Sequence, residues 1–266
     1  MVDLLDIKDL QVTFPPWSDP FVPVKNLSLD LAAGQVLGLV GQSGSGKSLT
    51  GLAVMGMIPR PGKITKGQIL FQGMDVTRYT PEQYRRIRGR EMFLIFQDCG
   101  SALTPSLTIG RQLAEIYVHT HGQSWKKGMI QAKKALERVN LEPGISNAYP
   151  FELSGGMRQR ILVSMAFAIQ PRLIIADEPT TGLDMITQAE ILDMFAALKD
   201  NCRVGILLIS HDLRVVGRLA DDVAVMYEGS IVDRSPVACL PEQGRHPHSR
   251  ELIAACQELS YPVKSC

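Results

Sequence analysis

The sequence predicts an α/β protein whose core is a parallel sheet covered by helices on both faces. After residue 155, helical and strand patterns alternate, with buried strands expected at 173–176 and 204–209. Near the N-terminus, the apolar run 36–40 leads directly into a glycine-rich loop and then a helical pattern. Alternation of this kind is typical of parallel strands joined by crossover helices.

Short strands are expected to lead into this core. Residues 3–40 are rich in β-branched and apolar residues and are interrupted by prolines, which predicts an antiparallel lead-in. Helical spacing at 48–58 ends at a proline-rich turn. Strands are then expected at 67–76, where a turn is included, and at 93–96, where Gln97 closes the strand.

The region from about 104 to 152 is mostly helical in pattern, which predicts a helical subdomain inserted between two strands of the core. We expect one domain over residues 1–266. Its expected parts are a core at about 1–100 and 160–240, the helical subdomain at about 101–159, and a helical tail at about 241–266.

Composition narrows the class of protein. The 266 residues are 45% hydrophobic and carry a formal net charge of +1, with basic residues scattered along the chain. No basic stripe suggests a nucleic-acid partner, and none is expected. The densest basic cluster lies at 85–90 and is either a solvated helix face or a surface that contacts phosphate or lipid.

Membrane-spanning and metal-binding patterns are not evident. The longest apolar stretches, such as 161–169, fall far short of the ~20 residues that span a bilayer. The acidic start at 1–6 lacks the features of a signal peptide, so a cytosolic location is expected. Five cysteines show no C-x-x-C spacing and are expected to be thiols rather than zinc ligands.

A phosphate-binding loop is the strongest motif. It fits G-x-x-x-x-G-K-[ST], and with the residue that follows it comprises Gly41, Gln42, Ser43, Gly44, Ser45, Gly46, Lys47, Ser48 and Leu49. Glycines allow backbone N–H groups to converge on phosphate oxygens, and the helix that follows adds a positive end. We expect Lys47 to reach the β- and γ-phosphates of a nucleotide and Ser48 to bind Mg²⁺.

Two adjacent carboxylates complete this chemistry. The buried strand at 173–176 ends in Asp177 and Glu178, which places both at the carboxyl end of a strand beside the phosphate-binding loop. Asp177 is expected to hold Mg²⁺, through a water molecule. Glu178 is our candidate general base for activating the attacking water. The cofactors expected from these residues are therefore a nucleotide and Mg²⁺, and the family resemblance given next implies that the nucleotide is ATP.

With these motifs, the chain resembles the ATP-binding subunit of an ABC transporter over essentially its whole length. The resemblance implies an α/β P-loop NTPase of ABC type, with a mixed, mainly parallel core sheet, an antiparallel N-terminal subdomain and an inserted helical subdomain. The motifs that carry it are Ser154, Gly155, Gly156 and Met157 of the signature, Gln97 of the Q-loop, Asp184 of the D-loop, the switch histidine His211, and Phe14.

The resemblance also implies roles for these residues. Gln97 would help to bind Mg²⁺ and act in catalysis, His211 would contact the γ-phosphate, and Phe14 would stack on adenine, with Trp17 as the competing candidate. The signature residues would act on ATP held by a partner subunit. Asp184 would communicate across that dimer.

The same resemblance implies partners. These are a second ABC ATPase, expected to be a paralogue that forms a heterodimer, two transmembrane permease subunits, and indirectly an extracytoplasmic solute-binding protein. The expected location is the cytoplasmic face of the inner membrane, as a peripheral subunit. Closure of the dimer would follow ATP binding.

Within the family, the Gly-Gly-Met-Arg-Gln-Arg run that begins at Gly155 resembles the peptide/nickel importer class. The short tail favours nickel, free or chelated, as the solute, with import of di- or oligopeptides as the alternative. A soluble ABC ATPase acting on DNA or ribosomes, or a silent regulator, fits less well. His119, His121, His246 and His248 are not expected to form a metal site, because no third ligand is placed nearby.

Overall fold

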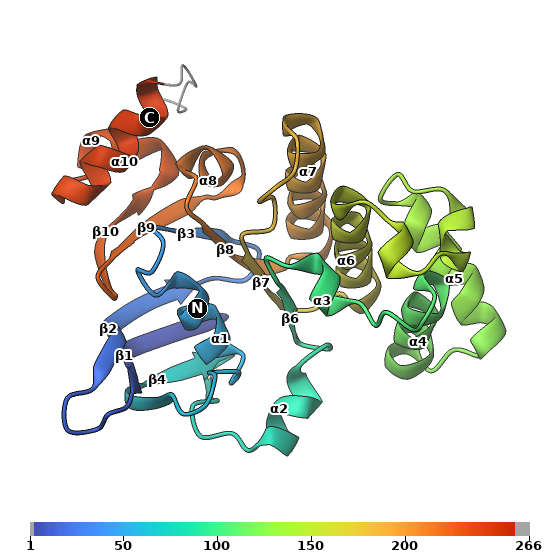
Figure 1. The fold of residues 1–266 in the computed structure, drawn as a ribbon, viewed down its shortest axis with the longest axis horizontal. Helices are drawn as coiled ribbons and strands as arrows, with labels where there is room; N and C mark the ends of the chain where they lie inside the picture. Colours follow the sequence, from blue (N-terminus) through green and yellow to red (C-terminus); the bar gives the residue numbers. More distant parts are fainter. Residues whose placement is uncertain (1–2, 259–266) are drawn as a thin grey trace.

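The computed structural model describes residues 3–258, which form two sheets and a cluster of helices (Figure 1). The strands are β1 (Leu5–Phe14), β2 (Phe21–Leu31), β3 (Val36–Val40), β4 (Lys63–Phe71), β5 (Met74–Asp75), β6 (Met92–Ile95), β7 (Leu173–Asp177), β8 (Gly205–Ser210), β9 (Asp222–Tyr227) and β10 (Ser230–Pro236).

Helices cover these sheets and form the inserted cluster. They are α1 (Lys47–Val54), α2 (Pro81–Ile87), α3 (Cys99–Ala102), α4 (Ile109–His121), α5 (Trp125–Glu137), α6 (Gly155–Ile169), α7 (Met185–Cys202), α8 (Leu213–Leu219), α9 (Leu240–Gln243) and α10 (Pro247–Glu258). Three short 3₁₀ turns are η1 (Pro143–Asn147), η2 (Pro150–Glu152) and η3 (Val237–Cys239).

The core is a six-stranded sheet in the order β10-β9-β3-β8-β7-β6. All neighbouring strands are parallel except β9 and β10, so the predicted mainly parallel core is confirmed. Every residue of β3 and β8 is buried, as expected for strands covered on both faces. In the parallel pairing, Val40 lies opposite Ser210, and Asp177 lies opposite Ile209. The carboxyl ends of β3, β7 and β8 therefore lie at the same edge of the sheet.

The antiparallel sheet has the order β2-β1-β4-β5. Two of its four strands, β4 and β5, lie after residue 40 and so outside the predicted antiparallel lead-in. The strand expected at 67–76 begins at Lys63 and pairs along β1. Gly67 makes this pairing possible: its φ is +79°, and a Cβ there would lie 2.4 Å from the carbonyl oxygens of Lys8 and Asp9. Local pattern alone did not indicate this long-range partner.

Helix α1 ends earlier than predicted. The expected helix over 48–58 covers Lys47–Val54, and the proline-rich turn is not what stops it. Gly56 takes φ +60°, and a Cβ at this position would lie 2.3 Å from the ring of Tyr84. The close approach of α2 therefore sets the end of α1.

The helical insertion lies between β6 and β7 and consists mainly of α4, α5 and α6. Its interior is apolar and includes Leu113, Leu136 and Ile161. In Figure 1 these helices lie at the opposite end of the molecule from α9 and α10. The α4–α5 cluster therefore projects from the core, while α6 also packs on α7.

Within residues 3–258, no helix combines the length and apolar character needed to cross a membrane. Of the expected C-terminal tail, residues 259–266 lie outside the described part of the chain. Cys202 and Cys256 are free thiols, whereas Cys239 is disulfide-bonded, so the expectation of thiols throughout is wrong at that residue.

Candidate functional site

The phosphate-binding loop joins β3 to α1 and encloses the amine of Lys47. Lys47 Nζ donates to the carbonyl oxygens of Gly41 at 2.7 Å and Gln42 at 2.9 Å. Gly46 has φ +104°, and a Cβ there would lie 2.4 Å from the carbonyl oxygen of Pro23, so only glycine fits. Burial lowers the pKa of Lys47, although Glu178 and Asp177 counteract this shift.

Ser48 and Asp177 meet beside this loop. The Ser48 hydroxyl donates to Asp177 Oδ1 at 2.9 Å, although 129 positions separate the two residues. Burial raises the pKa of Asp177, and the bond from Ser48 opposes that shift. A hydroxyl and a carboxylate are hard oxygen ligands of the kind that Mg²⁺ prefers, so the residues present fit this ion.

Glu178 is held on both carboxylate oxygens. Its Oε1 contacts the backbone N–H of His211 at 2.8 Å and His211 Nδ1 at 2.8 Å, while Oε2 accepts from Thr181 Oγ1 at 3.0 Å. Glu178 takes φ +49°, an uncommon conformation for this residue type. The strand end thus aims a mostly buried carboxylate at the exposed ring of His211.

Gln97 lies at the same edge of the sheet. It follows β6, whose Ile95 pairs in parallel with Ala176 immediately before Asp177. Gln97 is exposed. The structure therefore gathers the phosphate-binding loop, Asp177, Glu178, His211 and Gln97 along one edge, as the sequence predicts.

The signature residues lie on a different part of the molecule. Ser154 caps α6, and its hydroxyl accepts from the backbone N–H of Met157 at 3.3 Å. A Cβ on Gly156 would lie 2.8 Å from Thr187 Cγ2, so this glycine allows α6 to approach α7 closely. Figure 1 shows α6 and α1 well separated, with β6 and β7 between them.

Comparisons with known proteins show which family this chain belongs to. A family model described as ABC transporter matches residues 24–181. The oligopeptide transport ATP-binding protein OppD of Bacillus subtilis is 39% identical over 260 residues, which cover 96% of this chain and 72% of that protein. The chain belongs to the ABC transporter family. It is an ABC ATPase.

Other relatives and solved structures extend this result. The dipeptide transport ATP-binding protein DppD of Bacillus subtilis is 38% identical, covering 97% of this ABC ATPase and 78% of the relative. The glutathione import ATP-binding protein GsiA of Escherichia coli is 37% identical over 97% of the chain, but only 42% of GsiA is covered. A dimeric bacterial ABC transporter cassette matches with a TM-score of 0.78 at 25% identity, covering 88% of this chain and 98% of that one.

Asp184 has a structural role within this ABC ATPase. Its carboxylate caps α7, with Oδ1 accepting from the N–H groups of Ile186 at 3.0 Å and Thr187 at 2.9 Å. The Thr187 hydroxyl donates to Oδ2 at 2.7 Å. These bonds, led by those from Thr187, lower the pKa of Asp184. The role in dimer communication remains a prediction.

The two candidates for stacking on adenine have different surroundings. Phe14 is half-buried, and its ring packs so tightly on Gly62 that a Cβ there would lie 2.4 Å from Phe14 Cζ. Trp17 is 50% exposed and carries Lys63 Nζ 4.0 Å above its ring. Phe14 is therefore already engaged in packing, and Trp17 is the more accessible ring.

Sequence reasoning placed Thr181 in the D-loop run but gave it no role of its own. It stands three residues after Glu178 and binds the carboxylate oxygen opposite His211. The Asp-Glu-Pro-Thr-Thr run at 177–181 contained the information needed to predict this contact. If the chain turns after the strand, a hydroxyl three residues after Glu178 lies close to its carboxylate. The backbone N–H of Thr181 also donates to the carbonyl oxygen of Glu178 at 3.2 Å, which forms that turn.

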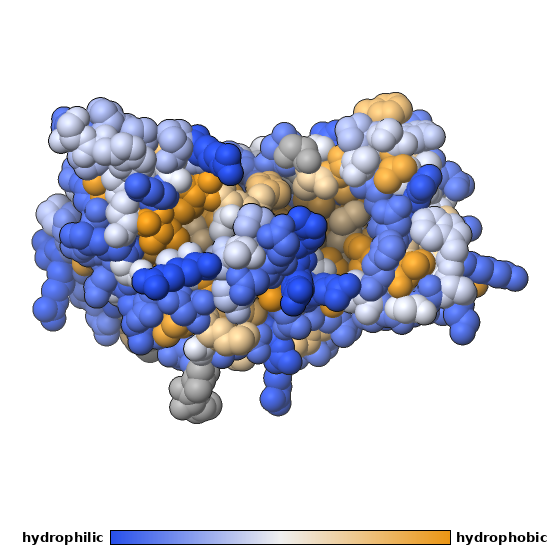
Figure 2. Space-filling view, turned by 90° about the horizontal axis from the view of Figure 1, so that it is seen from below, coloured by the Kyte–Doolittle hydropathy of each residue, from blue (hydrophilic) through white to orange (hydrophobic). Residues whose placement is uncertain are grey.

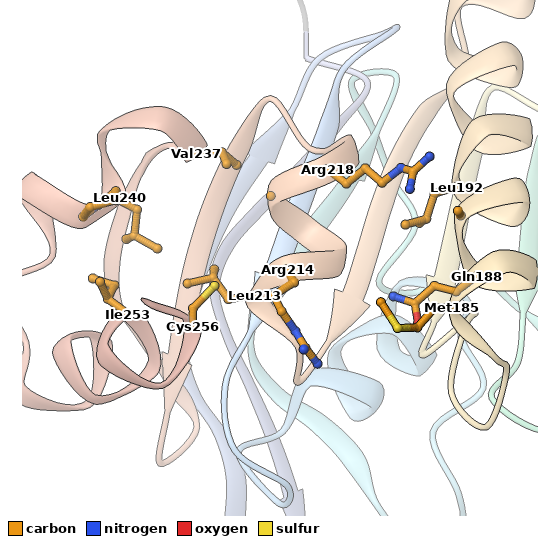
Figure 3. A pocket seen from close by; sticks show the side chains of 13 residues that line it. Met185, Gln188, Leu192, Leu213, Arg214, Arg218, Val237, Leu240, Ile253 and Cys256 are labelled. Carbon is orange, nitrogen blue, oxygen red and sulfur yellow. The ribbon is translucent and has the colours of Figure 1, made fainter. Parts of the chain in front are cut away.

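A separate cavity of about 470 Å³ lies between α7, α8, α9 and α10 (Figure 3). Its lining is mainly apolar and includes Leu192, Leu213 and Ile253. Arg214 and Arg218 lie at its edge, but their guanidinium groups bond to Asp212 and Asp193. None of the residues predicted to bind nucleotide lines it.

Proposed function

We propose that this chain is the ATP-hydrolysing subunit of a membrane importer of di- or oligopeptides. The observation that carries the solute class is the 38–39% identity to oligopeptide and dipeptide transport ATP-binding proteins across nearly the whole chain. The geometry supports ATP hydrolysis, because it joins the phosphate-binding loop to Asp177 and Glu178.

The expectation that nickel is the solute is replaced by the alternative, import of di- or oligopeptides. The relatives reported above are named for oligopeptide, dipeptide and glutathione transport. Glutathione is itself a small peptide, so these names share one chemical class. The short tail, on which the nickel expectation rested, says nothing about the solute-binding surface.

The phosphate-binding loop is proposed to bind the nucleotide's phosphates through its backbone N–H groups and Lys47. In the structure, the amine of Lys47 is bound by two loop carbonyls, and phosphate oxygens would be the stronger, charge-assisted acceptors. Ser48 and Asp177, with Gln97 at the same edge, would hold Mg²⁺, which neutralises phosphate charge when bound. The residue after the loop, Leu49, packs against the core.

Glu178 is proposed as the general base that takes a proton from the attacking water. His211 N–H and Nδ1 and the Thr181 hydroxyl fix the direction of its carboxylate. Because His211 is 57% exposed in its side chain, its ring is open to a γ-phosphate bound in the loop. The pair would then couple proton acceptance to phosphate contact.

The separation of Ser154 from the phosphate-binding loop supports a shared site between two ATPases. The signature helix α6 begins with a serine cap and two glycines, which would present backbone donors to ATP on a partner. We propose a paralogous second ATPase, two permease subunits and a solute-binding protein as partners. The subunit would then be peripheral at the cytoplasmic face of the inner membrane.

Uptake by cells that carry the complete transporter tests this function. Labelled dipeptide and labelled nickel are compared in cells with the wild-type chain and with Glu178→Gln. We expect dipeptide uptake to be lost in the variant while nickel uptake is unchanged. Loss of nickel uptake alone would contradict the peptide assignment and support the hypothesis that nickel is the solute.

A further inference from the structure

A basic groove lies between the outer edge of β4 and residues 77–88, which include α2. Its volume is about 510 Å³. Four cationic residues line it, namely Lys63, Lys66, Arg78 and Arg88. None of the described residues that line the groove is acidic. This concentration of positive charge contrasts with the net charge of +1 for the whole chain.

The floor of this basic groove offers a hydroxyl group. Tyr84 is 4% exposed, and Arg88 lies 4.5 Å above its ring. Tyr79 meets the same ring edge-on at 5.7 Å. No residue in the described range 3–258 hydrogen-bonds the Tyr84 hydroxyl. Burial raises the pKa of Tyr84 to about 12, so the phenol stays protonated and can donate.

The cations at the rim face open space rather than carboxylates. Lys66 and Arg78 are exposed, and within residues 3–258 they form no ion pair. Asp75 acts electrostatically on Tyr84, and its Oδ1 accepts from the backbone N–H of Thr77 at 2.9 Å. Glu82 on α2 pairs with Arg85 at 3.6 Å. Lys63 lies over the exposed ring of Trp17, which extends the rim with an aromatic surface.

The groove is connected to the helix that follows the phosphate-binding loop. Arg88 Nε donates to the carbonyl oxygen of Met55 at 2.7 Å, and Nη2 donates to that of Gly56 at 2.7 Å. These carbonyls directly follow α1, which begins at Lys47. A negative charge that competes for Arg88 would therefore act on the end of α1.

We propose that the basic groove binds a phosphate-bearing ligand. Lysine, arginine and a protonated phenol are donors that match phosphate oxygens, and no carboxylate in the lining competes for them. The phosphate is carried either by an anionic lipid headgroup or by a soluble metabolite. The basic cluster at 85–90, which includes Arg88, thereby acquires a phosphate contact in addition to a solvated helix face. Figure 2 shows hydrophilic residues in the middle of the face around α2, with apolar residues on either side.

If Lys63 and Lys66 served only a structural role, the groove would not be expected to bind phosphate. Beyond Leu70 and Phe71, the side of β4 that faces away from β1 has no strand partner in the described part of the chain. Lysines at such an edge discourage pairing with other strands, and Lys63 and Lys66 stand there. This role requires no ligand and no contribution from the Tyr84 hydroxyl.

The test uses the full-length chain saturated with Mg-ADP, so that the nucleotide site is filled. Binding is measured to vesicles of phosphatidylglycerol and phosphatidylcholine in equal parts, to vesicles of phosphatidylcholine alone, and to glycerol phosphate in solution. The groove variant is Lys63→Gln/Lys66→Gln/Arg78→Gln. The control variant, Lys126→Gln/Lys127→Gln/Lys133→Gln, removes the same charge from exposed positions on α5.

We expect the groove variant to bind roughly 100-fold more weakly, because each basic side chain near an anionic surface contributes about five-fold. The control variant should bind like wild type, and Tyr84→Phe should weaken binding several-fold. Loss confined to mixed vesicles identifies a lipid phosphate, and loss with glycerol phosphate identifies a soluble one. Equal loss in groove and control variants, no binding of either probe, or an unchanged Tyr84→Phe would overturn the site.

Discussion

Replacing Glu178 with glutamine should stop ATP hydrolysis while preserving the fold and nucleotide binding. In the structure, Oε1 of Glu178 contacts two nitrogens of His211, and Oε2 accepts from Thr181 Oγ1. The amide oxygen of glutamine can remain toward His211. Its NH₂ group can donate to the Thr181 hydroxyl, which accepts as well as donates. The substitution is therefore nearly isosteric and removes mainly the capacity to accept a proton.

The expected magnitude follows from that single loss. A positioned general base contributes about 10²- to 10⁴-fold to the rate, so kcat should fall by this factor. ATP affinity should change little, because the assigned phosphate contacts come from Lys47 and the loop. ATP turnover is measured with the chain assembled with its partner subunits, and nucleotide affinity by equilibrium binding. A nucleotide-bound closed dimer should accumulate in the variant.

Glu137→Gln on α5 is the matched control, since it removes one exposed carboxylate far from the strand ends. Its turnover should equal that of the wild type. If Glu178→Gln retains kcat within about three-fold of wild type, Glu178 is not the general base. If instead ATP affinity collapses, the carboxylate organises the binding site rather than the proton transfer.

Substitutions at three further positions test other parts of the structure. Thr181→Val removes the bond to Glu178 and should lower kcat about ten-fold with a changed pH profile, while Thr181→Ser should restore both; equal rates in all three proteins would exclude a positioning role. Gly38→Ala places a Cβ 2.2 Å from a valine methyl of α8 and should destabilise the fold by about 1–3 kcal/mol in denaturant unfolding, and an unchanged midpoint would contradict this packing. The bond from Arg234 lowers the pKa of Asp30 below its ordinary value of 3.8, so this stabilisation is present above that pH and is lost as the pH falls through the lowered pKa. Because both side chains are partly exposed, Asp30→Asn should cost only about 0.5 kcal/mol at neutral pH and nothing in strong acid, and a cost that grows with acid would refute the assignment.

Local patterns predicted the placement of the glycine-rich loop and its neighbouring residues well. The strand, glycine-rich loop and Lys47 are consecutive in the chain, so their relative positions follow from strand, turn and helix geometry. Asp177 joins them because parallel strands end at the same edge. The contact between Ser48 and Asp177 follows from that edge, although the residues are distant in sequence.

Long-range packing could not be predicted in the same way. The pairing of β4 with β1 depends on partners 50 or more residues apart, and a period-two pattern does not reveal which strand pairs with which. The contact between Phe14 and Gly62 spans a similar distance. By contrast, the capping of α7 by Asp184 is local, and it could have been predicted because aspartate is a preferred residue at the start of a helix.

Reconstituted transport tests the central proposal most directly. ATP hydrolysis and dipeptide uptake are measured together in vesicles that contain the complete transporter, with the wild-type chain or with Lys47→Ala. We expect the dipeptide to stimulate ATP hydrolysis and to enter the vesicles only with the wild-type chain, while nickel does neither. Dipeptide uptake that persists with Lys47→Ala, or hydrolysis stimulated by nickel and not by the dipeptide, would contradict the account.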